Sequence, residues 1–173
     1  MNLDPSLLAE QGKQAFAAGK FDQAAGLFSE AATAYSAAND RLSAAEMKNN
    51  LCVALSKLGK AQEALQAVVG TDKVFEEAGD IRRQGIAIGN QAEALESLGR
   101  LDEALAAYER SAALLAEAGE NELRSIILQS IATLKLRRGK MMDAALSMIG
   151  SVETTPKPNL LQRLLRFLLR FLR

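Results

Sequence analysis

The sequence predicts an all-α fold in which helical hairpins stack side by side. Three observations predict it: an internal repeat with a period of 40 residues, apolar residues that step by three and four within each repeat, and a glycine or asparagine where each predicted helix has to end. The 173 residues, of which 49% are hydrophobic, are enough for a short solenoid or for one compact domain.

A glycine followed by a basic residue marks the repeat. Its four copies are Gly19, Gly59, Gly99 and Gly139. An alanine stands five residues after each glycine, and four residues later come Phe28, Val68, Tyr108 and Met148. Because so many positions agree at one spacing, the sequence predicts four copies of one structural unit.

The third unit shows its two helices most clearly. In the second helix, apolar residues step by three and four from Leu101 to Leu115, which places them along one helix face. The first helix has the same spacing from Ile88 to Leu98 and ends at Gly99. The repeated alanine lets the two helices approach closely. Each unit is therefore predicted to be an antiparallel hairpin, which must stack on its neighbours to bury its apolar face.

Glycine and asparagine mark the helix ends, because both accept the left-handed conformation that terminates a helix. Each second helix is expected to stop at Asn39, Gly79 and Gly119. Gly70 interrupts the second helix of unit two, where we expect a bend. The fourth unit is degenerate: Lys135 replaces the leucine of units two and three, and Thr155-Pro156 halts its second helix.

Each unit carries a small residue, then Gly, an apolar or aromatic residue, Asp or Glu, Ala and a large apolar residue. The small residue is Gly12, Cys52, Ala92 or Ala132, and the clearest copy of the rest is LGRLDEALAAYERS at residues 98–111. This pattern resembles the tetratricopeptide repeat (TPR), in the long-helix 40-residue subclass of kinesin light chain-type adaptors. The resemblance implies a right-handed α-solenoid of about four TPR hairpins, and the spacing of the last residues, described below, adds a C-terminal amphipathic helix. The solenoid would occupy residues 1–155, with units at about 4–40, 44–80, 84–120 and 124–155.

The same resemblance implies a binding groove, because such solenoids hold a partner peptide on the concave surface lined by the first helix of each unit. The matching positions here are Asn49, Asn50, Val53, Lys57, Asn90, Glu93, Gln129, Ser130 and Arg137. Asn50 and Asn90 stand 40 residues apart, and an amide that donates and accepts could hold a peptide backbone. The alternative is that these amides satisfy solvent or a local helix group. No clamp for an acidic chain terminus is expected, because Ala9 and Ile86 stand where basic residues are needed.

The composition argues against catalysis and against bound metals or cofactors. The chain has no histidine and a single cysteine, which leaves no zinc-ligand cluster, no disulfide framework and no histidine-based acid–base pair. Cys52 occupies the small-residue position, so we expect structural burial; a reactive thiol is the alternative. The 21 basic and 21 acidic residues balance, which argues against a nucleic-acid-binding protein.

The C-terminal segment differs from the rest. The last 17 residues carry five basic and no acidic side chains, which leaves the first 156 residues with a net charge of −5. A Pro-containing linker at 156–159 precedes a predicted helix at 160–173. In this helix one face would carry Arg163, Arg166, Arg170 and Arg173. The wide opposite face would carry Leu161, Leu164, Leu165, Phe167, Leu168, Phe171 and Leu172, with Leu160 and Leu169 beside them.

So large an apolar face is expected to leave water, since each such side chain gains about 1.5 to 3 kcal/mol on full burial. At about 22 Å the predicted helix is shorter than a hydrocarbon core of about 30 Å, so lying in a membrane interface fits better than crossing it. The sequence therefore predicts a non-enzymatic adaptor in the cytoplasm, docked at an anionic membrane surface; no secretory signal is visible in MNLDPSLLAE. The alternative is a structural subunit of a complex or homo-oligomer, in which this helix is buried against a partner or caps the solenoid.

Overall fold

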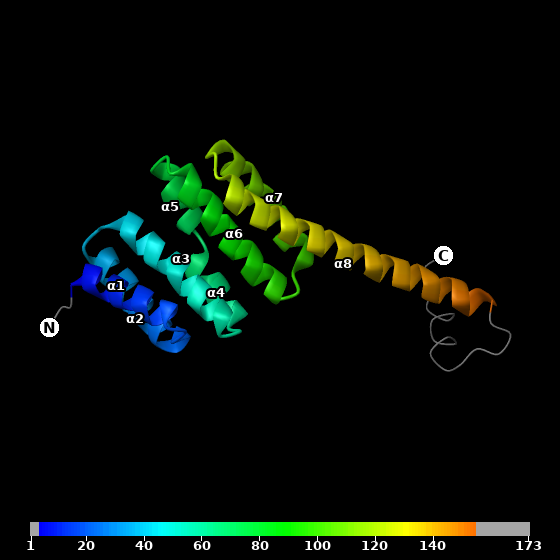
Figure 1. The fold of residues 1–173 in the computed structure, drawn as a ribbon, viewed down its shortest axis with the longest axis horizontal. Helices are drawn as coiled ribbons and strands as arrows, with labels where there is room; N and C mark the ends of the chain where they lie inside the picture. Colours follow the sequence, from blue (N-terminus) through cyan, green and yellow to red (C-terminus); the bar gives the residue numbers. More distant parts are fainter. Residues whose placement is uncertain (1–3, 155–173) are drawn as a thin grey trace. The chain divides into compact units, whose positions relative to one another are not determined.

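The computed structural model describes the backbone of residues 4–154 and the side chains of residues 4–137 and 139. This part of the chain is helical and contains no strand, which confirms the predicted all-α solenoid class (Figure 1). Its helices are α1 (Pro5–Ala17), α2 (Phe21–Ala37), α3 (Arg41–Lys57), α4 (Ala61–Val68), α5 (Thr71–Glu77), α6 (Ile81–Ser97), α7 (Leu101–Glu117) and α8 (Asn121–Thr154). The chain divides into two compact units, Met1–Ile131 and Ala132–Arg173.

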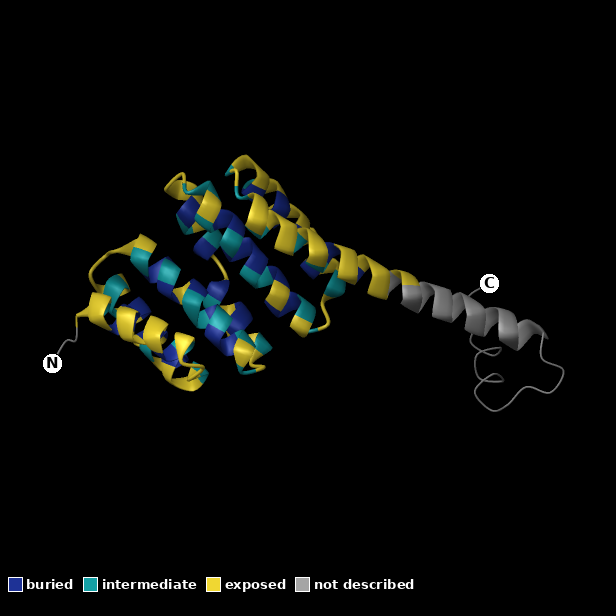
Figure 2. Cartoon of the chain, viewed as in Figure 1, coloured by how far each residue is buried: buried dark blue, intermediate teal, exposed yellow. Residues whose placement is uncertain are grey.

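The first unit is a stack of three helical hairpins. Helices α1 and α2 form the first, α3 with α4 and α5 the second, and α6 with α7 the third; α3 also packs on α2, and α6 on α3, α4 and α5. Buried residues lie where a helix meets its neighbours, and exposed residues lie on the outer sides (Figure 2). The repeated alanines Ala24, Ala64 and Ala104 are fully buried, as their role in close helix packing requires.

In the first three repeats, the predicted stops are present at the end of the first helix and at the end of the hairpin. At the end of α6, the N–H of Gly99 donates to the carbonyl of Glu96 (2.9 Å), and the N–H of Arg100 donates to that of Leu95 (3.0 Å). This pair of hydrogen bonds requires the first donor residue to adopt the left-handed conformation, and Gly99 has φ +75°. Asn39 supplies the same conformation with φ +60°, so each stop follows from local sequence.

At Gly70 the helix is broken rather than bent. Helix α4 ends at Val68, Gly70 adopts φ +82°, and α5 begins at the buried Thr71. The hydroxyl of Thr71 donates to the carbonyl of Val68 (2.8 Å), which satisfies one acceptor left over at the end of α4. The second hairpin therefore has a two-piece second helix, at the position where the sequence predicted a bend.

The fourth repeat is not a hairpin: α8 runs without a break through Gly139 to Thr154. The stops of the first three units place a buried apolar residue, such as Leu55 or Leu95, four residues before the glycine. Lys135 holds this place in the fourth repeat and is exposed, so no apolar contact favours a reversal of the chain. Glycine permits a left-handed turn without requiring one, and Gly139 continues the helix.

No helix among the described residues is long and apolar enough to cross a membrane. The predicted linker 156–159 and amphipathic helix 160–173 lie outside the described residues, and so does every residue predicted to dock to a membrane or subunit.

Candidate functional site

Two hollows lie on the face formed by the first helix of each repeat. The first, the α1–α3 hollow, has a volume of about 240 Å³ and is lined by Lys13, Phe16, Phe28, Glu46, Asn50 and Val53. The second, the α6–α8 hollow, has a volume of about 470 Å³. It is lined by Ile86, Gly89, Asn90, Glu93, Glu96, Tyr108, Ser111, Leu115, Leu123, Ile126, Ile127 and Ser130.

The two hollows are equivalent by the repeat, two periods apart. Lys13, Phe16 and Phe28 of the first correspond to Glu93, Glu96 and Tyr108 of the second. Likewise, Glu46 and Asn50 correspond to Ile126 and Ser130. The same arrangement of helices therefore carries opposite charges at one equivalent position, because Lys13 of the α1–α3 hollow is replaced by Glu93 in the α6–α8 hollow.

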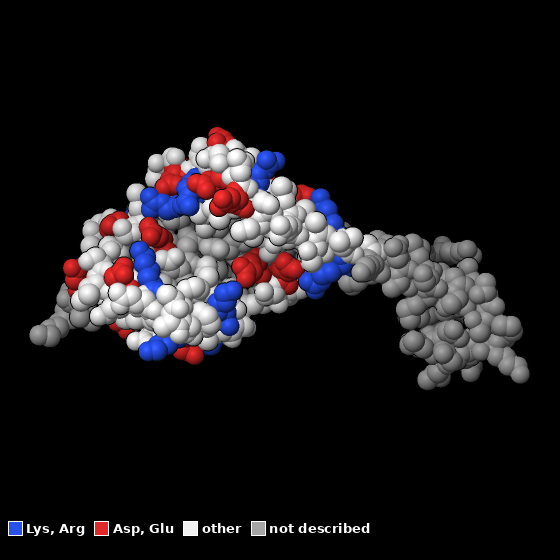
Figure 3. All heavy atoms as spheres, viewed as in Figure 1, with Lys and Arg blue, Asp and Glu red and all other residues white. Residues whose placement is uncertain are grey.

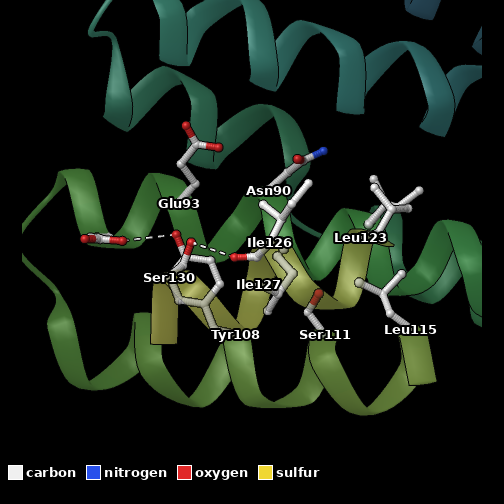
Figure 4. A pocket seen from close by; sticks show the side chains of 12 residues that line it. Asn90, Glu93, Tyr108, Ser111, Leu115, Leu123, Ile126, Ile127 and Ser130 are labelled. Atoms are coloured by element: carbon white, nitrogen blue, oxygen red, sulfur yellow. Dashed lines mark hydrogen bonds between the residues drawn. The ribbon is translucent and has the colours of Figure 1, made fainter. Parts of the chain in front are cut away.

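The α6–α8 hollow combines apolar walls with carboxylates at one end (Figure 4). Ile126 is 58% exposed, whereas Leu123 and Ile127 are half-buried. Glycine at position 89 keeps the floor open, because a Cβ there would meet Ile127 and Ser111, each at 3.1 Å. The hollow can therefore take up apolar side chains of a partner, with charge at its edge.

Tyr108 joins the two helices that carry the polar end. Its hydroxyl donates to Glu96 Oε2 (3.1 Å), a bond drawn in Figure 4. Burial, followed by the negative charge of Glu96, raises the pKa of Tyr108 far above its ordinary value, so the phenol stays protonated. Glu93 lies exposed on the rim and forms no ion pair with another described residue.

An amide ladder inside the stack connects the second and third hairpins. Asn49 is buried, and its Nδ2 donates to the Ala45 carbonyl (3.0 Å) and to Thr71 Oγ1 (3.3 Å). Its Oδ1 accepts from Asn90 Nδ2 (3.2 Å). Asn49, one of the predicted groove residues, is thus an internal residue that holds α3 against α5 and α6.

The other predicted groove residues divide into two sets. Asn50 and Val53 line the α1–α3 hollow, while Asn90, Glu93 and Ser130 line the α6–α8 hollow. Lys57 and Gln129 are exposed on α3 and α8 and line neither hollow, and Arg137 is exposed in the second compact unit.

Sequence reasoning missed the apolar walls of the hollows. Tyr108 and Phe28 were assigned only to helix packing, and Ile126 and Ile127 to no role. A signal was present, because Glu46, Ile86 and Ile126 stand at one repeat position, four residues before the amides and Ser130 that were identified. Residues four positions apart lie on one helix face, so the position four residues before each identified groove residue belongs to the same surface.

Cys52 lies in the core, as its repeat position predicted, and is 1% exposed. Burial, followed by the negative charge of Glu93, raises the pKa of Cys52 to about 12. No group of His, Cys, Asp and Glu residues in the described part of the chain could hold a metal ion.

Comparison with known proteins adds a family and two related folds. The family model described as "SNAP: Soluble NSF attachment protein, SNAP" matches residues 8–163. A TPR-like protein from Chlorobium tepidum has a similar structure, with a TM-score of 0.64 and 21% sequence identity, covering 76% of this chain and 94% of its own. BtubC (BKLC) from P. vanneervenii gives a TM-score of 0.58 and 18% identity, covering 90% of this chain and 69% of its own.

These two likenesses concern the fold, and they confirm that the chain is a TPR-like helical repeat protein. Among curated proteins, none matches the chain.

Proposed function

This chain belongs to the soluble NSF attachment protein family, and we propose that it is a non-enzymatic adaptor whose hollowed face binds a segment of a partner protein. The family and the TPR-like repeat support a role in protein interaction. The observation that carries the proposal is the pair of repeat-equivalent hollows, which present apolar surface next to charged or amide side chains.

The spacing of the hollows suits an elongated partner. Asn50 and Val53 on α3 and Asn90 and Glu93 on α6 are successive copies of the same two positions. A segment that crosses the stacked first helices would meet the same pair of positions at each repeat. Figure 3 shows one face of the molecule with a depression whose edges carry both acidic and basic side chains.

The test of the groove uses one arginine on the hollowed face and one on an outer helix. Ile126→Arg fills the α6–α8 hollow with a charged side chain, and Ile126 is exposed enough for the hairpins to stay folded. The control is Gln66→Arg, on the exposed side of α4. We expect Ile126→Arg to reduce co-purification of the partner at least tenfold, with the control unchanged. Equal loss in both variants, or loss only in the control, would contradict the groove.

For the C-terminal segment we extend the proposal to membrane docking. Residues 160–173 would lie in the interface with arginines towards anionic headgroups, behind the linker 156–159, while the solenoid of residues 1–155 carries the net negative charge. Each arginine near such a surface contributes about 1 kcal/mol.

Vesicle sedimentation tests the membrane proposal. The full chain should pellet with phosphatidylserine-containing vesicles and much less with neutral ones, and a chain ending at Thr155 should remain in the supernatant with both. Equal pelleting of the two chains would remove membrane docking. A stable lipid-free oligomer that dissociates when residues 157–173 are deleted would favour the other candidate function, a structural subunit whose core this segment completes.

A further inference from the structure

The α6–α8 hollow carries two acidic side chains that the repeat itself does not require. Glu93 and Glu96 lie one helical step apart on α6 and both line the hollow. Their counterparts in the first two repeats are Lys13, Phe16, Val53 and Ser56. The hairpins therefore close with other residue types at these two positions, and helix packing alone does not explain a pair of carboxylates beside an apolar wall.

We infer that the α6–α8 hollow binds a partner segment in which a lysine or arginine stands beside an aliphatic residue. The inference rests on the proposed function and names the chemistry of the partner at one of the two hollows. Three observations support it: the charges of the two hollows, the position of the carboxylates, and the order of polar and apolar side chains along the hollow.

The charges that line the two hollows differ. The α6–α8 hollow is lined by Glu93 and Glu96 and by no lysine or arginine. The α1–α3 hollow is lined by Lys13 and Glu46, one charge of each sign, and Glu46 already pairs with Arg83 (3.2 Å). A basic side chain is therefore attracted by the charges that line the α6–α8 hollow, whereas Lys13 repels it in the α1–α3 hollow. Charge complementarity thus favours a basic partner residue in one hollow only.

The two carboxylates are placed where a partner can reach them. Glu93 is exposed on the rim, and Glu96 is half-buried and accepts the hydrogen bond of the Tyr108 hydroxyl (3.1 Å). Burial first, and then the negative charges of Glu96 and Glu93, raise the pKa of Tyr108. The field of both carboxylates therefore acts inside the hollow, and a bound cation would offset it.

Polar and apolar side chains lie at opposite ends of the hollow. In Figure 4 the side chains of Glu93, Tyr108 and Ser130 lie at one end. The side chain of Leu123 lies at the other end, and Ile126, which is 58% exposed, lies between the two ends. An aliphatic side chain can thus enter beside Leu123 while an ammonium or guanidinium group reaches the carboxylates.

The size of the hollow suits such a pair of side chains. Its volume of about 470 Å³ lies within the range of about 300–1,000 Å³ typical of binding pockets. Lysine and arginine combine an aliphatic stem with a charged head, so the stem can lie on Ile126 while the head stays at the exposed Glu93. An acidic partner residue would be repelled by the same two glutamates, so the hollow selects its partner by the sign of the charge.

Selection from a random peptide library tests the inference on the full chain. The probe is a phage-displayed library of random peptides of about 12 residues, first depleted on the Ile126→Arg variant and then selected on the parent chain. The depletion removes peptides that bind elsewhere on the protein. We expect the enriched peptides to contain lysine or arginine within about four residues of leucine, isoleucine or methionine, the spacing of neighbours on one helix face.

Fluorescence anisotropy with the most enriched peptide then compares variants of the full chain. Glu93→Gln/Glu96→Gln should bind the peptide about fivefold more weakly, because charge pairs near the surface are lost. The matched control is Glu30→Gln/Glu63→Gln, which changes the net charge equally at exposed positions of α2 and α4 that line neither hollow, and it should bind like the parent. Replacing the basic residues of the peptide with glutamine should weaken binding to the parent and have little further effect on Glu93→Gln/Glu96→Gln.

Enriched peptides without basic residues would overturn the inference, and so would equal affinity of the two double variants or a library that yields no peptide. An oligomer of the parent chain that Ile126→Arg dissociates would place a second copy in the hollow and would also overturn it. Each variant is first compared with the parent by circular dichroism, and the single change Glu93→Gln at an exposed site serves if the double variant is destabilised. Co-purification of the partner with Ile126→Arg decides the adaptor proposal separately, so failure of the one is distinguishable from failure of the other.

Discussion

Gly12 and Phe28 show how one hydrogen atom decides the fit of the first hairpin. A Cβ at position 12 would lie 2.7 Å from Phe28 Cε1, and the ring is only 2% exposed, so it has little room to move. Cys52 and Ala92 occupy the same repeat position in the next two hairpins. In the first hairpin, glycine is thus matched to the phenyl ring that it faces.

A pair of glycine substitutions tests this match. Gly12→Ala should lower the free energy of unfolding by about 1–3 kcal/mol, because it overpacks the buried Phe28. Gly26→Ala, in the exposed interior of α2 with nothing within 4 Å of the new Cβ, should raise it by about 0.5–1 kcal/mol through helix propensity. Urea denaturation of both variants gives the comparison. A Gly12→Ala variant as stable as the parent would show that Phe28 relocates at little cost.

The thiol of Cys52 is predicted to be inert in the folded protein. With a pKa of about 12, about one molecule in ten thousand carries the thiolate at pH 8. The thiol reagent dithiobis(nitrobenzoate) should therefore react with Cys52 at least a hundredfold more slowly in the native chain than in the chain in urea. Fast native labelling would contradict the burial.

The same group makes stability depend on pH. Its folded pKa is raised, so its contribution is complete below the unfolded value of about 8.5 and is lost as the pH rises towards 12. Cys52→Ala should weaken this decline of the unfolding free energy above pH 9.

At the scale of the element, α8 is the informative case, because its glycine repeats the motif of three turns and yet lies within a helix. Gly99→Ala places a Cβ on a residue with φ +75° and should cost about 1–2 kcal/mol. Gly139→Ala replaces an exposed helical glycine and should gain about 0.5–1 kcal/mol, with higher helicity by circular dichroism. If Gly139→Ala lost as much stability as Gly99→Ala, the result would instead support the fourth hairpin that the sequence predicted.

At the scale of the whole molecule, stability should be highest in the middle of the hairpin stack. Helix α1 packs on α2, whereas α3 packs on α2, α4, α5 and α6, and α6 packs on α3, α4, α5 and α7. In a solenoid each unit is stabilised by its neighbours, so central helices open less often than terminal ones.

Hydrogen exchange followed by mass spectrometry should find the slowest amides of the hairpin stack in α3 and α6 and faster exchange in α1. Exposed ion pairs between repeats, for example Lys60 with Asp22 at 3.6 Å, contribute little to this order. Uniform protection from α1 to α6 would indicate a single cooperative unit instead.

The sequence by itself determined the local features of this protein. The period of 40, the stops at Gly99 and Asn39 and the position of the interruption at Gly70 could be predicted because they depend on a residue's own conformational range and on helical spacing. The small-residue position of Cys52 followed from the same repeat.

Only the tertiary structure decided which repeats close into hairpins and what their side chains meet. Gly139 permits a turn that the exposed Lys135 does not support, and Asn49 bonds inward to Thr71 and Asn90 while the next residue, Asn50, lines the α1–α3 hollow. Likewise, the α6–α8 hollow needs three helices to be formed. The physical reason is that packing and hydrogen bonds between distant segments set these outcomes, and a repeat pattern records the positions of residues without the contacts that select among their conformations.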